Sequence, residues 1–162
     1  MSKKIVLAVP MAILALGSSM AFAANDARTS INISATIPSS QFHAQPVDAD
    51  FGNDEKMAYD LVSGTLSPLR AAYNVKHTDG GVAAYVEGGP QPLFNGADTI
   101  ALTYTFNGVL LSAAPQVVVS EAAAKPGIRA ELVIAAAAKP APAQVGNYTA
   151  NPTIIFDALP KP

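Results

Sequence analysis

Near its N-terminus the chain contains a run in which apolar and polar positions alternate without a break. From Ala27 to Ile37 the odd positions carry Ala, Thr or Ile, and the even positions carry Arg, Ser, Asn or Thr. A period of two places one set of side chains on one face of a β-strand. Pro38 lacks a backbone N–H and precedes two serines, so we expect the strand to end there. The pattern therefore predicts an extended arm at residues 24–38.

The rest of the chain consists of short apolar or alternating runs that are separated by turn residues, which is typical of an antiparallel all-β domain. Asn107-Gly108 lies between two such runs and is a strong signal for a two-residue hairpin turn. We expect strands at residues 57–62, 69–76, 82–86, 99–106, 109–112, 117–119, 128–135 and 153–156.

Two alanine-rich segments have a helical composition but contain or meet proline. Residues 121–125 carry an i,i+4 charge pair and are followed at once by Pro126, so we expect one helical turn at most. Residues 135–143 are interrupted by Pro140 and Pro142, which favours an extended linker between strands. Neither segment changes the prediction of an all-β fold.

Seven or eight short strands in about 120 residues favour a two-layer β-sandwich of the immunoglobulin type. A small closed barrel is the main alternative. The length leaves room for one domain, which we place at residues 39–162.

The first residues have the features of a secretory signal peptide. Lys3 and Lys4 precede an apolar run at residues 5–17, and Ala21-Phe22-Ala23 forms an A-x-A cleavage site. The apolar run of about 13 residues is shorter than the ~20 that a membrane span needs. We therefore expect residues 1–23 to be removed during export, which would leave 162 − 23 = 139 residues.

Charge and cysteine content narrow the possible partners and chemistry. Without Lys3 and Lys4, eight basic residues face twelve acidic ones, and a net charge of −4 makes the chain a poor nucleic-acid binder. The chain has no cysteine. Disulfides, thiol catalysis and zinc sites built from thiolates are therefore excluded.

The sequence contains no recognisable catalytic, cofactor or metal-binding motif. His43 and His77 are the only histidines, and we interpret His43 as a loop residue and His77 as a polar strand residue. The acidic segment at residues 48–55 lacks the bidentate glutamate of a calcium loop, because Tyr59 takes the twelfth place. We therefore expect no enzyme, although a pocket that joins His77 to an acid and a serine would indicate a small secreted hydrolase.

Several short motifs occur in an order that resembles a known family. The chain resembles the colonization factor antigen I type of fimbrial major subunits, the alternate or class 5 chaperone-usher family that includes the cable pilins. It differs by being shorter and richer in proline at residues 121–127. The motifs are Met57-Ala58-Tyr59, Val75-Lys76-His77-Thr78, Pro90-Gln91-Pro92-Leu93, Asn107-Gly108-Val109-Leu110-Leu111-Ser112, Glu131-Leu132-Val133-Ile134 and Gly146-Asn147-Tyr148-Thr149.

The resemblance implies an incomplete Ig-like sandwich that is completed by the N-terminal strand of a neighbouring subunit, a process called donor-strand exchange. It assigns the partner-binding side chains to Ile31, Ile33, Ala35 and Ile37 and the end of the strand to Pro38. Periodicity by itself favours an ordinary first strand that pairs within its own sandwich.

The resemblance also implies a function and partners. Identical subunits would polymerise head to tail into an adhesive surface fimbria, with the help of a periplasmic chaperone and an outer-membrane usher, and a separate tip adhesin is a possible further partner. The alternative is a tip adhesin or a secreted single-domain binding module. In that case Tyr85 and Phe94, beside the turn at residues 88–92, are candidates for ligand contact, although core packing also explains them.

Overall fold

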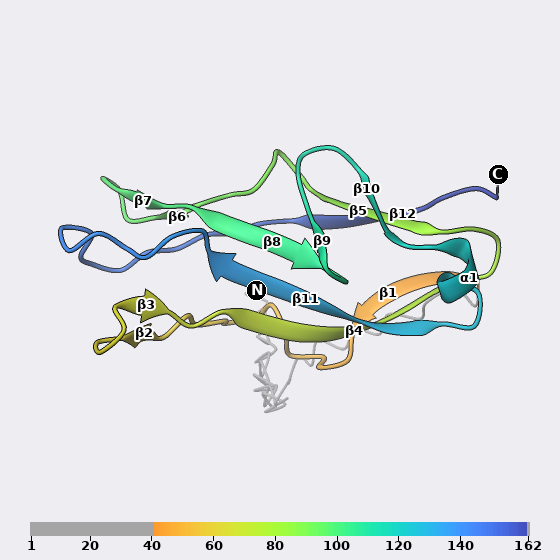
Figure 1. Cartoon of the computed structure of the whole chain (residues 1–162), viewed down its shortest axis with the longest axis horizontal. Helices are drawn as coiled ribbons and strands as arrows, with labels where there is room; N and C mark the ends of the chain where they lie inside the picture. Colours follow the sequence, from red (N-terminus) through yellow and green to blue (C-terminus); the bar gives the residue numbers. More distant parts are fainter. Residues whose placement is uncertain (1–40, 162) are drawn as a thin grey trace, which may run out of the picture. The chain divides into compact units, whose positions relative to one another are not determined.

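The computed structural model describes residues 41–161, which form two antiparallel β-sheets packed face to face (Figure 1). The larger sheet has the strand order β1-β4-β11-β8-β9 and the smaller one the order β10-β5-β12. Two short ribbons, β2-β3 and β6-β7, extend the domain. The elements are β1 (Phe42–Pro46), β2 (Tyr59–Asp60), β3 (Thr65–Leu66), β4 (Leu69–His77), β5 (Val82–Val86), β6 (Leu93–Phe94), β7 (Thr99–Ile100), β8 (Leu102–Phe106), β9 (Val109–Leu110), β10 (Gln116–Val119), α1 (Glu121–Ala124), β11 (Ile128–Ala136) and β12 (Ile154–Ala158).

The central strands of the larger sheet follow the alternation that the sequence predicts. In β4 the odd positions from Ala71 to His77 are buried, while Arg70 and Asn74 are exposed. In β8 and β11 buried residues alternate with more exposed ones in the same way. One face of the sheet therefore supplies the core and the other faces solvent.

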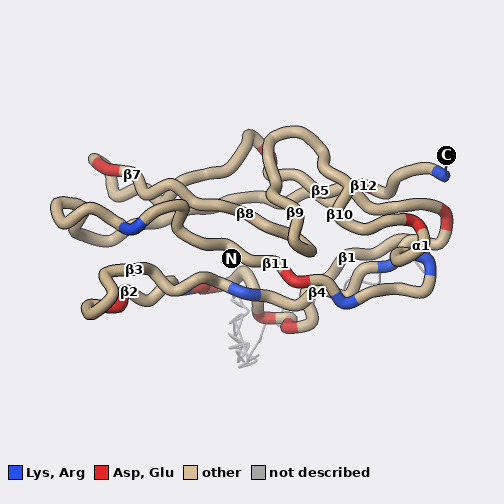
Figure 2. Tube along the Cα trace, viewed as in Figure 1, with Lys and Arg blue, Asp and Glu red and all other residues tan. Residues whose placement is uncertain are grey.

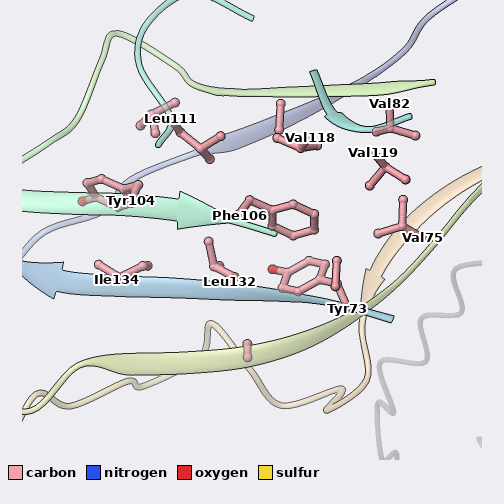
Figure 3. Close-up of a cluster of buried hydrophobic side chains, with 14 of the residues drawn as sticks. Tyr73, Val75, Val82, Tyr104, Phe106, Leu111, Val118, Val119, Leu132 and Ile134 are labelled. Carbon is pink, nitrogen blue, oxygen red and sulfur yellow. The ribbon is translucent and has the colours of Figure 1, made fainter. Parts of the chain in front are cut away.

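Apolar side chains from both sheets meet in the core (Figure 3). Phe106 packs edge-on against Tyr73 with 5.4 Å between ring centroids and against Phe156 of β12 at 4.9 Å. Tyr104, Leu132 and Val75 are at most 1% exposed. Edge-to-face pairs of this kind add about 0.5–1.5 kcal/mol each beyond the burial of their area.

The predicted hairpin at Asn107-Gly108 is confirmed. It joins β8 to β9, with Thr105 opposite Leu110 and Phe106 opposite Val109. Asn107 and Gly108 have φ angles of 50° and 79°, as a type I′ turn requires.

Most other predicted elements are also confirmed, with shifted boundaries. The two-layer sandwich, the strands at residues 69–76, 82–86 and 128–135, and a single helical turn in α1 are all present. The predicted strand at 99–106 is interrupted at Ala101, which separates β7 from β8. After β11 ends at Ala136, residues 137–153 link it to β12 without a further strand, apart from one bridge between Thr149 and Phe94.

Two predictions near the start of the domain are wrong. His43 is not in a loop, because it lies in β1 and pairs with Lys76 of β4. The strand predicted at 57–62 is only the two-residue β2, because the chain turns after Asp60 and pairs back through β3. His77, by contrast, is a strand residue as predicted, and only 6% of it is exposed.

Candidate functional site

The smaller sheet has an edge that nothing in the described part of the chain covers. β12 pairs with β5 along one side, from Ile154 opposite Val86 to Ala158 opposite Val82. Within residues 41–161 no strand pairs with its other side. Ile154 and Phe156 pack against the core but stay only half-buried. Such an edge presents free backbone N–H and C=O groups together with a partly exposed apolar row.

At the start of this edge lies a groove of about 1030 Å³ that reaches the core of the sandwich, and Ile154 is the residue of β12 that lines it. Its floor is formed by side chains from the inner face of the larger sheet, and Ile154 of β12 forms part of its wall. No residue of β1 lines it. Its apolar lining includes Phe51, Met57, Leu69, Tyr73, Leu93, Leu102, Tyr104, Leu132 and Ile134.

The floor of the groove is apolar and uncharged. The residues of β4, β8 and β11 that line it carry no charge, and the trace of β8 is tan in Figure 2. Burial raises the pKa of Tyr73 and of Tyr104, and the Tyr104 hydroxyl donates a hydrogen bond to the carbonyl oxygen of Gln91 at 2.7 Å. The charged residues that line the groove, Asp54, Glu55 and Lys56, all come from one loop.

One polar atom at the groove has no partner among the described residues. The hydroxyl group of Tyr148, which belongs to the groove lining, is buried and makes no hydrogen bond there. A buried hydroxyl without a partner is destabilising. The groove therefore has a polar atom without a hydrogen-bond partner, the Tyr148 hydroxyl, as well as apolar side chains such as Ile154 that are only partly buried.

The predicted donor-strand residues Ile31, Ile33, Ala35 and Ile37, and the terminator Pro38, lie outside the described residues. Their role remains a prediction. The sequence predicted this arm but did not indicate the groove, whose lining residues are spread from Phe51 to Ile154. The one local feature of the sequence that relates to the groove is the short apolar run at residues 153–156, most of which lies in β12.

The two histidines lie apart from the groove. The Nδ1 atom of His77 is 3.0 Å from the carbonyl oxygen of Gly81, and its ring packs edge-on against Phe42 at 5.6 Å. Within residues 41–161 no hydrogen bond joins His77 to an acid or a serine, and no three metal-ligating side chains cluster. The charged loop at residues 48–55 folds on itself, where the Asp50 amide donates to the Asp48 carboxylate at 3.0 Å.

The candidate ligand-contact residues, Tyr85 and Phe94, do not line the groove. Tyr85 is half-buried in β5. Phe94 is 49% exposed in β6, where its backbone pairs with Thr149. Neither residue lines the groove or the smaller pocket beside His43.

No helix among residues 41–161 is long and apolar enough to cross a membrane.

Comparisons with known proteins agree with this architecture. No curated protein matches the chain. Among solved structures, the CooA pilin subunit from enterotoxigenic Escherichia coli is similar in fold, with a TM-score of 0.52 and 17% sequence identity over 70% of this chain and 86% of that chain. The model of the CS1 type fimbrial major subunit family matches residues 27–157. The chain therefore belongs to the CS1 type fimbrial major subunit family and is a structural major pilin subunit of a cell-surface fimbrium.

Proposed function

We propose that the groove beside β12 accepts the N-terminal arm of another subunit, so that subunits join head to tail by donor-strand exchange. The observation that carries this proposal is the combination of a free β12 edge and a groove open to the core. An extended peptide that adds to such an edge gains affinity from main-chain pairing and specificity from alternate side chains. The arm at residues 24–38 has the alternation that this mode of binding requires.

The gain in free energy is large enough for a stable joint. Burial of Ile31, Ile33 and Ile37 contributes about 1.5–3 kcal/mol for each side chain, or roughly 4.5–9 kcal/mol before the cost of ordering the arm. Each new ladder hydrogen bond adds about 0.5–1.5 kcal/mol. A total of this size is comparable with the stability of a whole domain.

Chain connectivity favours an arm from a neighbouring subunit over the subunit's own arm. β1 begins at Phe42, which pairs with His77 at the end of β4. β12 finishes at the same end of the sandwich, because the backbone amide of Leu159 donates a hydrogen bond to the carbonyl oxygen of Gly81, four residues after His77. Only three residues separate Pro38 from Phe42. A subunit's own arm would therefore run parallel to β12, whereas a neighbour's arm can pair antiparallel. Every described ladder is antiparallel, and this pairing is slightly the more stable.

The rest of the assembly scheme follows from this role. The chain is exported by its signal peptide at residues 1–23, a periplasmic chaperone protects the open groove, and an outer-membrane usher exchanges the chaperone for the next arm. A joint of this kind does not close on itself, so it yields a filament. The subunit is a structural element without catalytic activity, and contact with the host is a property of the fibre or of a separate tip adhesin.

Substitution within the arm tests the proposal. Ile33→Asp should abolish fibres and leave export intact, because an unpaired carboxylate is too costly to bury in an apolar groove. Ser34→Asp is the matched control, since it adds the same charge to the opposite face of the same strand. The readout is the ladder of multimers on electrophoresis in SDS, with and without boiling.

The two variants separate the competing functions. A ladder from wild type and Ser34→Asp, and a monomer from Ile33→Asp, would support donor-strand exchange. Normal fibres from Ile33→Asp would contradict it. Monomers from all three proteins would instead favour a single-domain binding module.

A further inference from the structure

The β2–β3 hairpin presents two apolar side chains almost completely to solvent. Leu61 is 90% exposed and Val62 is 98% exposed, although both lie in a turn with defined hydrogen bonds. One oxygen of the Asp60 carboxylate accepts hydrogen bonds from the backbone amides of Val62 at 2.7 Å and Ser63 at 2.8 Å. The carbonyl oxygen of Asp60 accepts a further one from Gly64 at 2.7 Å. We call residues 60–64 the hairpin tip.

A further exposed apolar residue comes from a segment that reaches the same end of the sandwich. The side chain of Lys139, from the segment that links β11 to β12, lies against Gly64 of the hairpin tip. The same segment carries Val145, which is 73% exposed. In Figure 1 the β2–β3 hairpin and this segment extend beyond the sheets at the same end. Leu61 and Val62 are adjacent exposed aliphatic side chains in an ordered turn, which is typical of an interaction site.

The hairpin tip projects from the end of the sandwich at which the groove meets the start of β12. Tyr59 and Leu66, which pair with each other at the base of the hairpin, line the groove together with Ile154. The opposite end of the sandwich carries the start of β1, where Thr78 donates a hydrogen bond to the carbonyl oxygen of Gln41 at 2.9 Å. We call that end the β1 end.

Donor-strand geometry brings these two ends together. β12 starts at Ile154, which shares the groove with the base of the hairpin, and it runs towards the β1 end. An antiparallel arm in the groove would therefore finish, at Pro38, on the side of the hairpin tip. The chain from Pro38 to Phe42 spans four Cα–Cα steps, or about 14 Å at most. The β1 end of the subunit that donates the arm must therefore lie next to the hairpin tip of the subunit that receives it.

We propose that Leu61 and Val62 form a second contact between successive subunits, in which the hairpin tip docks against the β1 end of the subunit whose arm fills the groove. The proposal rests on the donor-strand function proposed above. The occupant of this apolar surface is a second copy of the same chain. The contact would fix the angle between subunits, because an arm with a short linker holds them together but leaves them free to pivot.

Photo-cross-linking in assembled fibres tests the contact directly. A photoreactive benzophenone side chain at position 62 should cross-link to a neighbouring subunit, and mass spectrometry should place the link near Gln41, Thr78 or Leu159. The same group at Val117, which is 60% exposed in β10, is the matched control and should not give that link. Fibres in which position 62 gives no inter-subunit link, or a link elsewhere, would overturn the proposal.

A double variant, Leu61→Ser with Val62→Ser, measures how much the contact contributes. It should still give the boiling-sensitive ladder, because the arm is intact, and its fibres should dissociate on heating about tenfold faster or more. Val117→Ser is the control and should dissociate as wild type does. If the fibres of the double variant dissociate at the wild-type rate, the proposed contact is wrong. If wild-type protein itself gives no ladder of multimers, donor-strand exchange is wrong.

Discussion

At the scale of single residues, Asn107 shows how one side chain fixes a turn and ties it to its surroundings. Its φ of 50° lies in the left-handed region, which asparagine tolerates better than most residues. Its side-chain amide donates a hydrogen bond to the carbonyl oxygen of Val118 at 2.7 Å. The residue therefore joins the β8–β9 hairpin of the larger sheet to β10 of the smaller one. The dipeptide predicted the turn, but nothing in the sequence indicated the bond to Val118.

Two substitutions separate the contribution of the left-handed backbone conformation of Asn107 from that of its side-chain hydrogen bond. Asn107→Ala should lower the free energy of unfolding by about 2–3 kcal/mol, because it loses the hydrogen bond and strains the backbone. Asn107→Gly loses the bond but accepts the left-handed conformation, so it should cost about 1–2 kcal/mol. Urea unfolding of the purified subunit measures both values. Equal losses for the two variants would show that backbone strain is unimportant here.

At the scale of elements, alternation predicted the strands that have one buried face and missed those that tertiary contacts create. β4, β8 and β11 show the alternation clearly and were predicted. β1 was missed, because all five of its residues are half-buried and Pro46 is within it. It is a strand because it pairs with β4 along its whole length. The groove could not be predicted either, since it depends on how distant segments pack.

The β2–β3 hairpin should respond to pH through Asp60. The backbone amides of Ser63 and then Val62 lower the pKa of Asp60 below 3.8. The charged form is therefore favoured in the folded turn, so its stabilising effect is complete above about pH 4 and is lost as pH falls through the lowered pKa. We expect the amide NMR signals of Val62 and Ser63 to titrate together with a midpoint below 3.8.

Asp60→Asn is the control for this titration. Asparagine keeps an oxygen that can accept both amide hydrogen bonds but does not ionise in this range. The two amide signals should then stay constant across the acidic range. A titration that persists in Asp60→Asn would show that another group is responsible.

At the scale of the whole molecule, the domain has an apolar interior that its own described strands leave partly open. Five strands form one layer and three the other, and the groove beside β12 reaches the core. Because the chain has no cysteine, no disulfide stabilises the domain beside this open groove. Full stability should therefore come from a partner that fills the groove.

An added arm peptide should stabilise the domain. A peptide of residues 27–38, supplied to a subunit that lacks its arm, should raise the free energy of unfolding by about 2.7 kcal/mol at 100 times its Kd. This corresponds to about 10 °C in Tm for a domain of this size. Differential scanning fluorimetry measures the shift, and the same peptide with Ile33→Asp should give none. Equal shifts from both peptides would contradict specific filling of the groove.

The direction of β12 also determines how a fibre resists a pulling force. The strand points along the sandwich towards the end that carries the start of β1, so in the proposed joint tension transmitted through the link between Pro38 and Phe42 would act along the strand. Ladder hydrogen bonds lie perpendicular to that direction. They are therefore loaded in shear and share the force, whereas in peeling they would break one after another. An attached fibre would in this way hold under flow by bonds that are individually weak.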